Sequence, residues 1–139
     1  MLKIQDIMST DVYVVDAEAS AEEAAWGLTR RHIGGAPVRD AEGGLVGMVT
    51  KGDLVNPEPA QWIRGEATVE DVMNPDVLAL FADDPALSAA VGMATRKIHR
   101  VVVIDANHRM AGIVTAFDIV KAVAAGLDFR VPPADDKDP

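Results

Sequence analysis

The chain has 139 residues, 49% of them hydrophobic and 25% charged, and its formal net charge at pH 7 is −9. This length suits one compact domain or two small halves that share a core, and the acidic excess argues against a nucleic-acid surface, which needs a contiguous basic face. The sequence has no cysteine for disulfides or thiolate metal sites and no apolar stretch long enough to cross a membrane, so we expect a soluble cytoplasmic protein without nucleic-acid or membrane partners.

The first half of the chain predicts a strand, a helix, two strands and a second helix. Apolar runs and turn residues place these elements at residues 13–15, 20–31, 36–38, 45–49 and from 50 onward. Ser20 and Glu23 have the spacing of a capping box, which marks the start of the first helix. Its core-facing stripe consists mainly of alanines, which let a helix lie close to a sheet. We expect Gly34 and Gly35 to end this helix.

The second half repeats that order, with elements expected at residues 78–81, 84–97, 101–104, 110–114 and 116–125. Asp84 is the expected N-cap of its first helix and Pro85 the first helical residue. Gly126 is expected to terminate the last helix. We therefore divide the chain into a first repeat, a proline-containing connector, a second repeat and a disordered C-terminal tail. Their expected boundaries are 1–58, 59–67, 68–126 and 127–139.

The two halves are an internal duplication. A shift of 65 residues aligns residues 6–55 with 71–120 without a gap, and 19 of the 50 pairs are identical. Unrelated segments of ordinary composition share about 3 to 4 in such a comparison. A copy of this size buries too little apolar surface to be stable alone. We therefore expect the copies to pack sheet to sheet about a pseudo-two-fold axis, with two related clefts between them.

Each copy ends in the same polar motif at a strand-to-helix junction. Thr50 and Asp53 in the first copy correspond to Thr115 and Asp118 in the second. A threonine at the N-cap and an aspartate one turn later place a hydroxyl, a carboxylate and free backbone N–H groups on one side, which forms a small polar cup. The alternative is that each pair only caps its own helix, because the same spacing defines a capping box. The two roles are compatible.

The duplicated order, an opening Asp-x-Met, a closing Gly-x-Val-Thr-x-x-Asp and the 65-residue spacing resemble tandem cystathionine-β-synthase (CBS) domains, over about residues 4–125. The resemblance implies an α/β fold of two β-α-β-β-α repeats, often called a Bateman module. It also implies a regulatory protein that binds AMP, ADP, ATP or S-adenosylmethionine between the repeats, requires no cofactor and often forms a flat, disc-shaped homodimer.

The resemblance also implies two sets of ligand-binding residues. In each, the aspartate takes the ribose hydroxyls, the threonine assists at the ribose or phosphate, and apolar residues of the other copy contact the base. The first cleft would be formed by Thr50, Asp53, Val77, Leu78, Ile98, His99 and Arg100. The second would be formed by Thr115, Asp118, Val12, Tyr13 and Ile33.

The two clefts are expected to differ on their phosphate sides. His99 and Arg100 resemble a His-Arg pair that faces phosphate in nucleotide-binding members of the family, whereas Gly34 and Gly35 occupy the matching positions of the first copy. The planar guanidinium of arginine suits phosphate. We therefore predict that the cleft containing Asp53 is the better phosphate binder. The alternative is that His99 and Arg100 are solvated residues at a strand edge.

Other polar and aromatic residues give weaker signals. His32 and His108 lack partners at metal-ligand spacing, so we interpret them as surface histidines. Trp26 lies off the alanine stripe and is expected to face solvent or a dimer partner. Trp62 lies in the connector, where it could close a cleft or join the two copies. No set of catalytic residues is present, and we expect neither a metal nor catalysis.

These observations predict a non-enzymatic regulatory protein. An adenosine-containing ligand would shift the arrangement of two packed halves and thereby change the affinity for an effector protein. Two alternatives remain open. In one, the duplicated fold serves only oligomerisation or partner docking, without a ligand. In the other, the chain is part of an enzyme that hydrolyses a nucleotide in the cleft.

Overall fold

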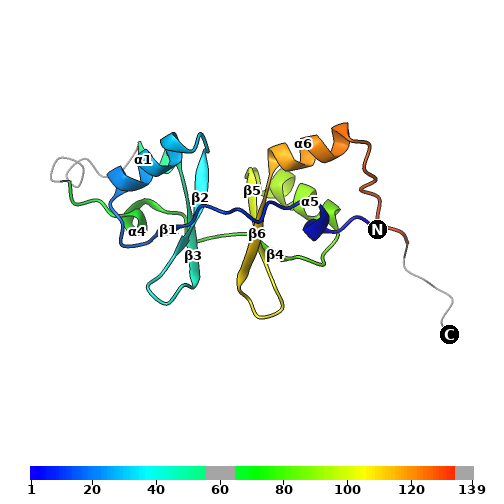
Figure 1. Cartoon of the computed structure of the whole chain (residues 1–139), viewed down its shortest axis with the longest axis horizontal. Helices are drawn as coiled ribbons and strands as arrows, with labels where there is room; N and C mark the ends of the chain where they lie inside the picture. The colour runs from blue at the N-terminus through cyan, green and yellow to red at the C-terminus, as the bar shows by residue number, and fades with distance from the viewer. Residues whose placement is uncertain (56–64, 134–139) are drawn as a thin grey trace. The chain divides into compact units, whose positions relative to one another are not determined.

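The computed structural model describes residues 1–55 and 65–133. Its contacts divide the chain into two compact units. Unit 1 consists of Met1–Thr10 and the chain from Leu78 onward, and unit 2 consists of Asp11–Val77. Each unit contains a three-stranded sheet with helices packed on it (Figure 1). Within the described ranges, no helix has both the length and the apolar character that a membrane-spanning segment requires.

Unit 2 contains β1 Val15–Asp16, α1 Ala21–Arg30, β2 Gly35–Arg39, β3 Leu45–Thr50, α2 Lys51–Leu54 and α4 Val69–Val72. The strand order is β1-β2-β3, with β1 parallel to β2 and β2 antiparallel to β3. Helix α1 begins after Ser20, as predicted. The hydroxyl oxygen of Ser20 accepts a hydrogen bond from the backbone N–H of Glu23 at 3.0 Å, which satisfies one free donor of the first turn.

Unit 1 contains η1 Ile4–Asp6, β4 Ala79–Phe81, α5 Ala86–Arg96, β5 Arg100–Ile104, β6 Met110–Thr115 and α6 Ala116–Ala124. The strand order is β4-β5-β6, with β4 parallel to β5 and β5 antiparallel to β6. Helices α5 and α6 pack against each other and against β5 and β6. Val101, Val102 and Val103 of β5 are fully buried, as expected for the central strand of a covered sheet.

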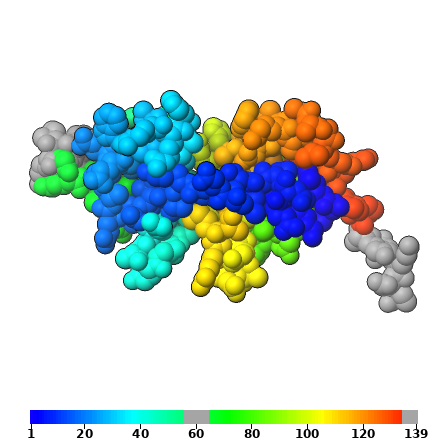
Figure 2. Space-filling view, viewed as in Figure 1, coloured from blue at the N-terminus to red at the C-terminus, as the bar shows by residue number. Residues whose placement is uncertain are grey.

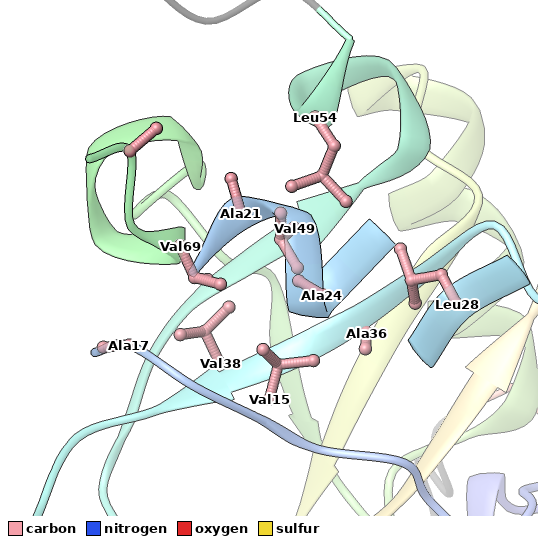
Figure 3. Close-up of a cluster of buried hydrophobic side chains, with 11 residues drawn as sticks. Val15, Ala17, Ala21, Ala24, Leu28, Ala36, Val38, Val49, Leu54 and Val69 are labelled. Atoms are coloured by element: carbon pink, nitrogen blue, oxygen red, sulfur yellow. The ribbon is translucent and has the colours of Figure 1, made fainter. Parts of the chain in front are cut away.

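The core of unit 2 lies between its sheet and its helices (Figure 3). Leu28 of α1, Val38 of β2, Val49 of β3 and Val69 of α4 are all fully buried. Burying an aliphatic side chain of this kind contributes about 1.5–3 kcal/mol of transfer free energy. The predicted alanine stripe of α1 faces this core, which brings the helix close to the strands.

The predicted order of strands and helices is confirmed in both repeats, and α1 ends within one residue of the predicted position, but the residues expected to end it were predicted incorrectly. The helix stops at Arg30, and the chain turns through His32, which has a φ of 55°. Gly35 already belongs to β2 and neither Gly34 nor Gly35 has a positive φ. A non-glycine residue therefore takes the left-handed position, at a cost of about 1–2 kcal/mol.

The start of α5 also differs from the prediction by one residue. Pro85 is the N-cap rather than the first helical residue. Asp84 does not cap α5, because its Oδ2 accepts a hydrogen bond from the backbone N–H of Phe81 at 2.8 Å. At the other end of the unit, Gly126 follows α6 with a φ of 79°, as predicted for a helix terminator.

The first ten residues of the chain belong to unit 1, although the predicted boundaries place them in the first repeat. Ile4 is fully buried in the core of unit 1, and its backbone N–H donates to the carbonyl of Asp84 at 2.9 Å. Ser9 forms a β-bridge with Ile113 of β6. In Figure 2 these blue residues lie against the other atoms of unit 1. The repeat boundaries along the sequence stay a prediction, since the compact units are composed differently.

In each unit an equivalent segment, around Ser9 in unit 1 and around Asn74 in unit 2, lies beside the last strand. In unit 2, Asn74 forms a bridge with Met48, just as Ser9 does with Ile113 in unit 1. A glycine makes room for each segment. A Cβ at Gly112 would lie 2.6 Å from the carbonyl oxygen of Ser9, and one at Gly47 would lie 3.0 Å from that of Asn74. These close backbone approaches explain why both repeats carry glycine there.

Candidate functional site

Thr50 and Asp53 lie at the junction of β3 and α2 in unit 2. Thr50 is the N-cap, and its Oγ1 accepts a hydrogen bond from the backbone N–H of Asp53 at 3.3 Å. In return, Oδ2 of Asp53 accepts one from the backbone N–H of Thr50 at 2.9 Å. The backbone N–H of Lys51 donates to the carbonyl of Gly34 at 2.9 Å. Both motif side chains belong to half-buried residues.

Thr115 and Asp118 repeat this geometry at the junction of β6 and α6 in unit 1. Oγ1 of Thr115 accepts from the backbone N–H of Asp118 at 3.2 Å, and Oδ2 of Asp118 accepts from the backbone N–H of Thr115 at 2.8 Å. The second carboxylate oxygen, Oδ1, lies 3.4 Å from Nζ of Lys121, while the Asp118 side chain is only 11% exposed. The Asp118 carboxylate is therefore largely shielded from water.

These reciprocal bonds confirm the capping role of both Thr–Asp pairs, whereas ligand contact at Asp53 and Asp118 stays a prediction. Each capping box uses only Oδ2 of its aspartate. In the described part of the chain, Oδ1 of Asp53 accepts no hydrogen bond, and the backbone N–H groups of Gly52 and Phe117 donate to no side chain. The Thr50 cup thus retains acceptor and donor capacity after capping, whereas in the Thr115 cup a ligand would share Oδ1 of Asp118 with Lys121.

The register of β5 and β6 brings His99 and Arg100 next to the Thr115 cup. Arg100 is paired with Thr115 across the two strands, and the carbonyl of His99 accepts from the backbone N–H of Ala116 at 2.9 Å. We grouped these two residues with Asp53 from the sequence, and that grouping across the two units stays a prediction. Within unit 1 their neighbours are at the Thr115 junction, because antiparallel strands place residues symmetrically about their turn.

The corresponding position in unit 2 has no cation. Gly35 is paired with Thr50, and Gly34 supplies the carbonyl that His99 supplies in unit 1. His99 and Arg100 therefore lie beside the Thr115 cup, where the Thr50 cup has Gly34 and Gly35. The charge of Arg100 makes the surroundings of the Thr115 cup more positive.

Arg100 is half-buried, and desolvation lowers its pKa below the ordinary value, although it stays charged at neutral pH. Within the described ranges its guanidinium has no hydrogen bond or ion pair. A desolvated cation without a partner costs free energy that a bound anion can offset. His99, in contrast, is exposed, as the solvated-edge alternative expects.

Six residues were predicted to contact the base, and all of them are half-buried in their own units. Those of unit 2 are Val12, Tyr13, Ile33 and Val77, and those of unit 1 are Leu78 and Ile98. Two of these side chains pack onto helices. A Cβ at Gly27 of α1 would collide with the hydroxyl end of Tyr13, and a Cβ at Gly92 of α5 would lie 2.5 Å from Cδ2 of Leu78.

Arg31 covers the ring of Tyr13, a contact that the sequence did not predict. The guanidinium carbon of Arg31 lies 3.9 Å from the ring centroid, and Nη1 donates to the carbonyl of Gly27 at 3.4 Å. A cation–π contact of this kind is worth about 0.5–1 kcal/mol at an exposed site. The Tyr13 ring therefore has a structural role in unit 2, and its contact with a base stays a prediction.

Among the described residues, no three His, Cys, Asp or Glu side chains are grouped in a way that could hold a metal ion. His32 and His108 are exposed and both have a positive φ. The Trp26 side chain is 61% exposed, as its position off the alanine stripe predicts. Trp62 lies outside the described residues.

A family model described as CBS domain matches residues 4–57 and 69–125. The chain belongs to the CBS domain family. Both matches fall on the duplicated segments, so the chain is a CBS domain pair and the resemblance inferred from the sequence is confirmed.

Some curated relatives of this CBS pair are much longer proteins. The L-aspartate semialdehyde sulfurtransferase of Methanocaldococcus jannaschii is 31% identical over 116 residues, which are 84% of this chain and 22% of that protein. The A-adding tRNA nucleotidyltransferase of Aquifex aeolicus is 30% identical over 127 residues, 91% of this chain and 15% of that protein. The chain therefore spans less than a quarter of the length of either relative.

Similar solved structures include CBS pairs with bound ligands. The CBS domain pair of MJ0100, in complex with 5′-methylthioadenosine and S-adenosyl-L-methionine, has a TM-score of 0.78 and 28% identity, covering 91% of this chain and 98% of that one. CBSX2 in complex with AMP has a TM-score of 0.78 and 26% identity, with coverages of 90% and 98%. CBSX2 is a CBS-pair protein of Arabidopsis thaliana.

Proposed function

We propose that this CBS pair is a non-enzymatic regulatory protein that binds an adenosine-containing ligand, namely AMP, ADP, ATP or S-adenosylmethionine. The observation that carries the proposal is the ligand content of two similar CBS pairs, which hold 5′-methylthioadenosine, S-adenosyl-L-methionine and AMP. These three compounds share an adenine and a ribose with neighbouring hydroxyl groups. A site that binds any of them must therefore recognise two neighbouring ribose hydroxyls next to an adenine base.

The two Thr–Asp cups offer the chemistry that a sugar diol requires. A carboxylate accepts hydrogen bonds from two neighbouring hydroxyls, and such charge-assisted bonds are about twice as strong as neutral ones. Oδ2 of each aspartate is engaged in the cap, which holds the carboxylate in one orientation. The cap therefore preorganises the acceptor, and Oδ1 is the oxygen that we assign to the ribose.

We assign the phosphate preference to the Thr115 cup. Arg100 lies beside Thr115 in the sheet, is half-buried and has no ionic partner in the described chain. The cup also lies at the N-terminus of α6, and a helix N-terminus favours an anion. The Thr50 cup has Gly35 at the matching position, so it is assigned to a ligand with less negative charge. This reverses the preference that we expected from sequence alone.

The proposed output is a change in the affinity for an effector protein. A ligand can shift the equilibrium between two arrangements of the protein only if it binds them with different affinities, and the effector must then distinguish the liganded from the unliganded protein.

We also propose a homodimer. Trp26 and Val91 occupy equivalent positions of α1 and α5 and are 61% and 54% exposed, which gives both repeats an apolar residue for such a contact. A cytoplasmic location stays a prediction.

Thermal unfolding with a panel of ligands tests the proposal. The panel contains AMP, ADP, ATP, adenosine and S-adenosylmethionine, with GMP as a base control. A ligand at 100 times its dissociation constant adds about 2.7 kcal/mol and raises the unfolding midpoint by roughly several degrees. A midpoint that no adenosine compound changes at millimolar concentration would contradict ligand binding and favour the docking alternative.

The enzymatic alternative makes a different prediction. If the chain hydrolysed a nucleotide, chromatography of ATP or AMP after incubation with the protein would show a product that grows with time. We expect the nucleotide to be recovered unchanged, because the sequence contains no recognisable set of catalytic residues.

A further inference from the structure

Unit 1 has an apolar groove of about 420 Å³ between α5 and the β4 segment. Leu78 and Leu80 line it from the strand side, and Leu87 and Val91 line it from one face of α5. Leu87 and Val91 are four residues apart, so their side chains lie on the same helix face. They are 37% and 54% exposed. The groove therefore presents apolar surface that its own unit covers only in part.

The equivalent surface of unit 2 is filled differently. The 65-residue shift replaces Leu78, Leu87 and Val91 by Tyr13, Glu22 and Trp26. In unit 2 the Tyr13 ring reaches over the helix glycine, and Arg31 covers the ring. In unit 1 the smaller leucine leaves more space at this place, and a carboxylate is replaced by a second leucine. The α5 groove is thus more apolar and less filled than its counterpart.

The C-terminal segment 127–133 reaches this groove. It has no helix or strand, yet Val131 forms part of the groove wall. The backbone N–H of Leu127 still belongs to the end of α6, where it donates to the carbonyl of Ala122 at 3.0 Å. From there to residue 133, the hydrogen bonds of the described chain join only Asp128 and Arg130.

We propose that residues 127–133 form a displaceable strap that closes the α5 groove through Val131. Asp128 and Arg130, just before Val131, form an exposed ion pair with Nη2 and Oδ2 2.8 Å apart. Val131 in the groove wall is 44% exposed and Phe129 is half-buried, so few apolar contacts hold the strap and it opens more easily than the helices beneath it. Opening uncovers an apolar surface of the kind that contacts other proteins.

The strap is tested by a chain that ends at Gly126, compared with the full chain. The truncated chain is expected to bind an apolar fluorescent dye, 8-anilinonaphthalene-1-sulfonate, more strongly. Amide hydrogens of α5 are expected to exchange roughly fivefold faster, as the loss of a half-buried valine contact implies. Amides of α1 in unit 2 should not change. Val131→Asp in the full chain should act in the same direction, whereas Val131→Ile and truncation after Pro133 should resemble the unaltered protein.

Adding Leu87→Ser to the truncated chain should remove the gain in dye binding, because it places a hydroxyl in the groove. Circular dichroism of each variant reports whether the helices are retained, and if the truncated chain loses them, the Val131→Asp variant decides. Unchanged dye binding and α5 exchange after strap removal or Val131→Asp would overturn the proposal. So would a gain in dye binding that persists with Leu87→Ser.

Discussion

Thr115 and Asp118 exchange two hydrogen bonds, with the Asp118 N–H to Thr115 Oγ1 at 3.2 Å and the Thr115 N–H to Asp118 Oδ2 at 2.8 Å. The pair therefore stabilises the start of α6 whether or not a ligand binds. Any test of ligand contact must separate these two roles. The equivalent pair in unit 2, Thr50 and Asp53, poses the same problem.

Asp118→Glu separates capping from ligand binding. Glutamate at this helix position also completes a capping box, so the free energy of unfolding should change by less than about 0.5 kcal/mol. The longer side chain moves the carboxylate away from the ribose, so the affinity for AMP should fall by about tenfold or more. Asp118→Ala should also lower the affinity for AMP, and it should reduce the free energy of unfolding by about 1 kcal/mol. Urea unfolding and AMP titration of both variants provide the measurements.

Arg100→Met tests the phosphate assignment. It keeps a long apolar stem but removes the charge, so AMP binding should weaken by about tenfold while adenosine binding stays nearly constant. The unliganded protein should be as stable or more stable, because a half-buried, unpaired cation is removed. Arg39→Met is the matched control, since Arg39 lies in an exposed ion pair with Asp16. Equal loss of adenosine and AMP affinity in Arg100→Met would refute a phosphate role.

Gly112→Ala should destabilise unit 1. The added Cβ would lie 2.6 Å from the carbonyl oxygen of Ser9, and relieving that overlap should cost about 1–3 kcal/mol. Gly52→Ala provides the control, because its Cβ meets only Oγ1 of Thr50 at 3.6 Å and alanine favours helix by up to about 1 kcal/mol. Thermal unfolding distinguishes the two, and an unchanged midpoint for Gly112→Ala would show that the Ser9 segment is not held as described.

Ile4→Ala tests whether the N-terminal segment belongs to unit 1. Ile4 is fully buried there, and truncating a buried isoleucine to alanine costs about 2–5 kcal/mol. Hydrogen exchange should therefore accelerate in α5 and β5 of unit 1 before it does in α1 and β2 of unit 2. The reverse order would place the segment with the rest of the first repeat, in unit 2.

The Asp128 carboxyl should titrate at unusually low pH. Hydrogen bonds from Arg130, first from its side chain and then from its backbone, lower the pKa of Asp128 from 3.8 to about 2. The stabilising contribution of this pair is therefore present above the ordinary pKa and is lost as the pH falls through about 2. NMR titration of the side-chain carboxyl carbon should show this midpoint, and Arg130→Gln should raise it toward the ordinary value. Lys121→Gln should leave it unchanged.

The strand and helix order was predictable because the duplication presents each element twice. Apolar runs such as Val101 to Ile104, separated by turn residues, left little ambiguity about which segments form strands and helices. Helix ends were less predictable. The sequence offers Gly34 and Gly35 as terminators, yet the chain accepts a positive φ at His32, and local glycine preference does not decide where the backbone turns.

The residues of the Thr–Asp cups were predictable, but their neighbours were not. The 65-residue shift identifies matching positions without indicating which elements pair in space. For that reason the position of Arg100 beside Thr115 and the packing of Met1–Thr10 in unit 1 both required coordinates. The contact of Val131 with the α5 groove was equally hidden, because residues 127–139 resemble a polar, proline-rich tail.

Isothermal titration of the full chain with AMP tests the central claim most directly. We predict saturable binding that is weakened by Asp118→Glu, with little loss of stability, and weakened again by Arg100→Met. Absence of binding by both AMP and S-adenosylmethionine up to about millimolar concentration, or full affinity in the Asp118→Glu variant, would contradict the account and leave the two Thr–Asp pairs as helix caps alone.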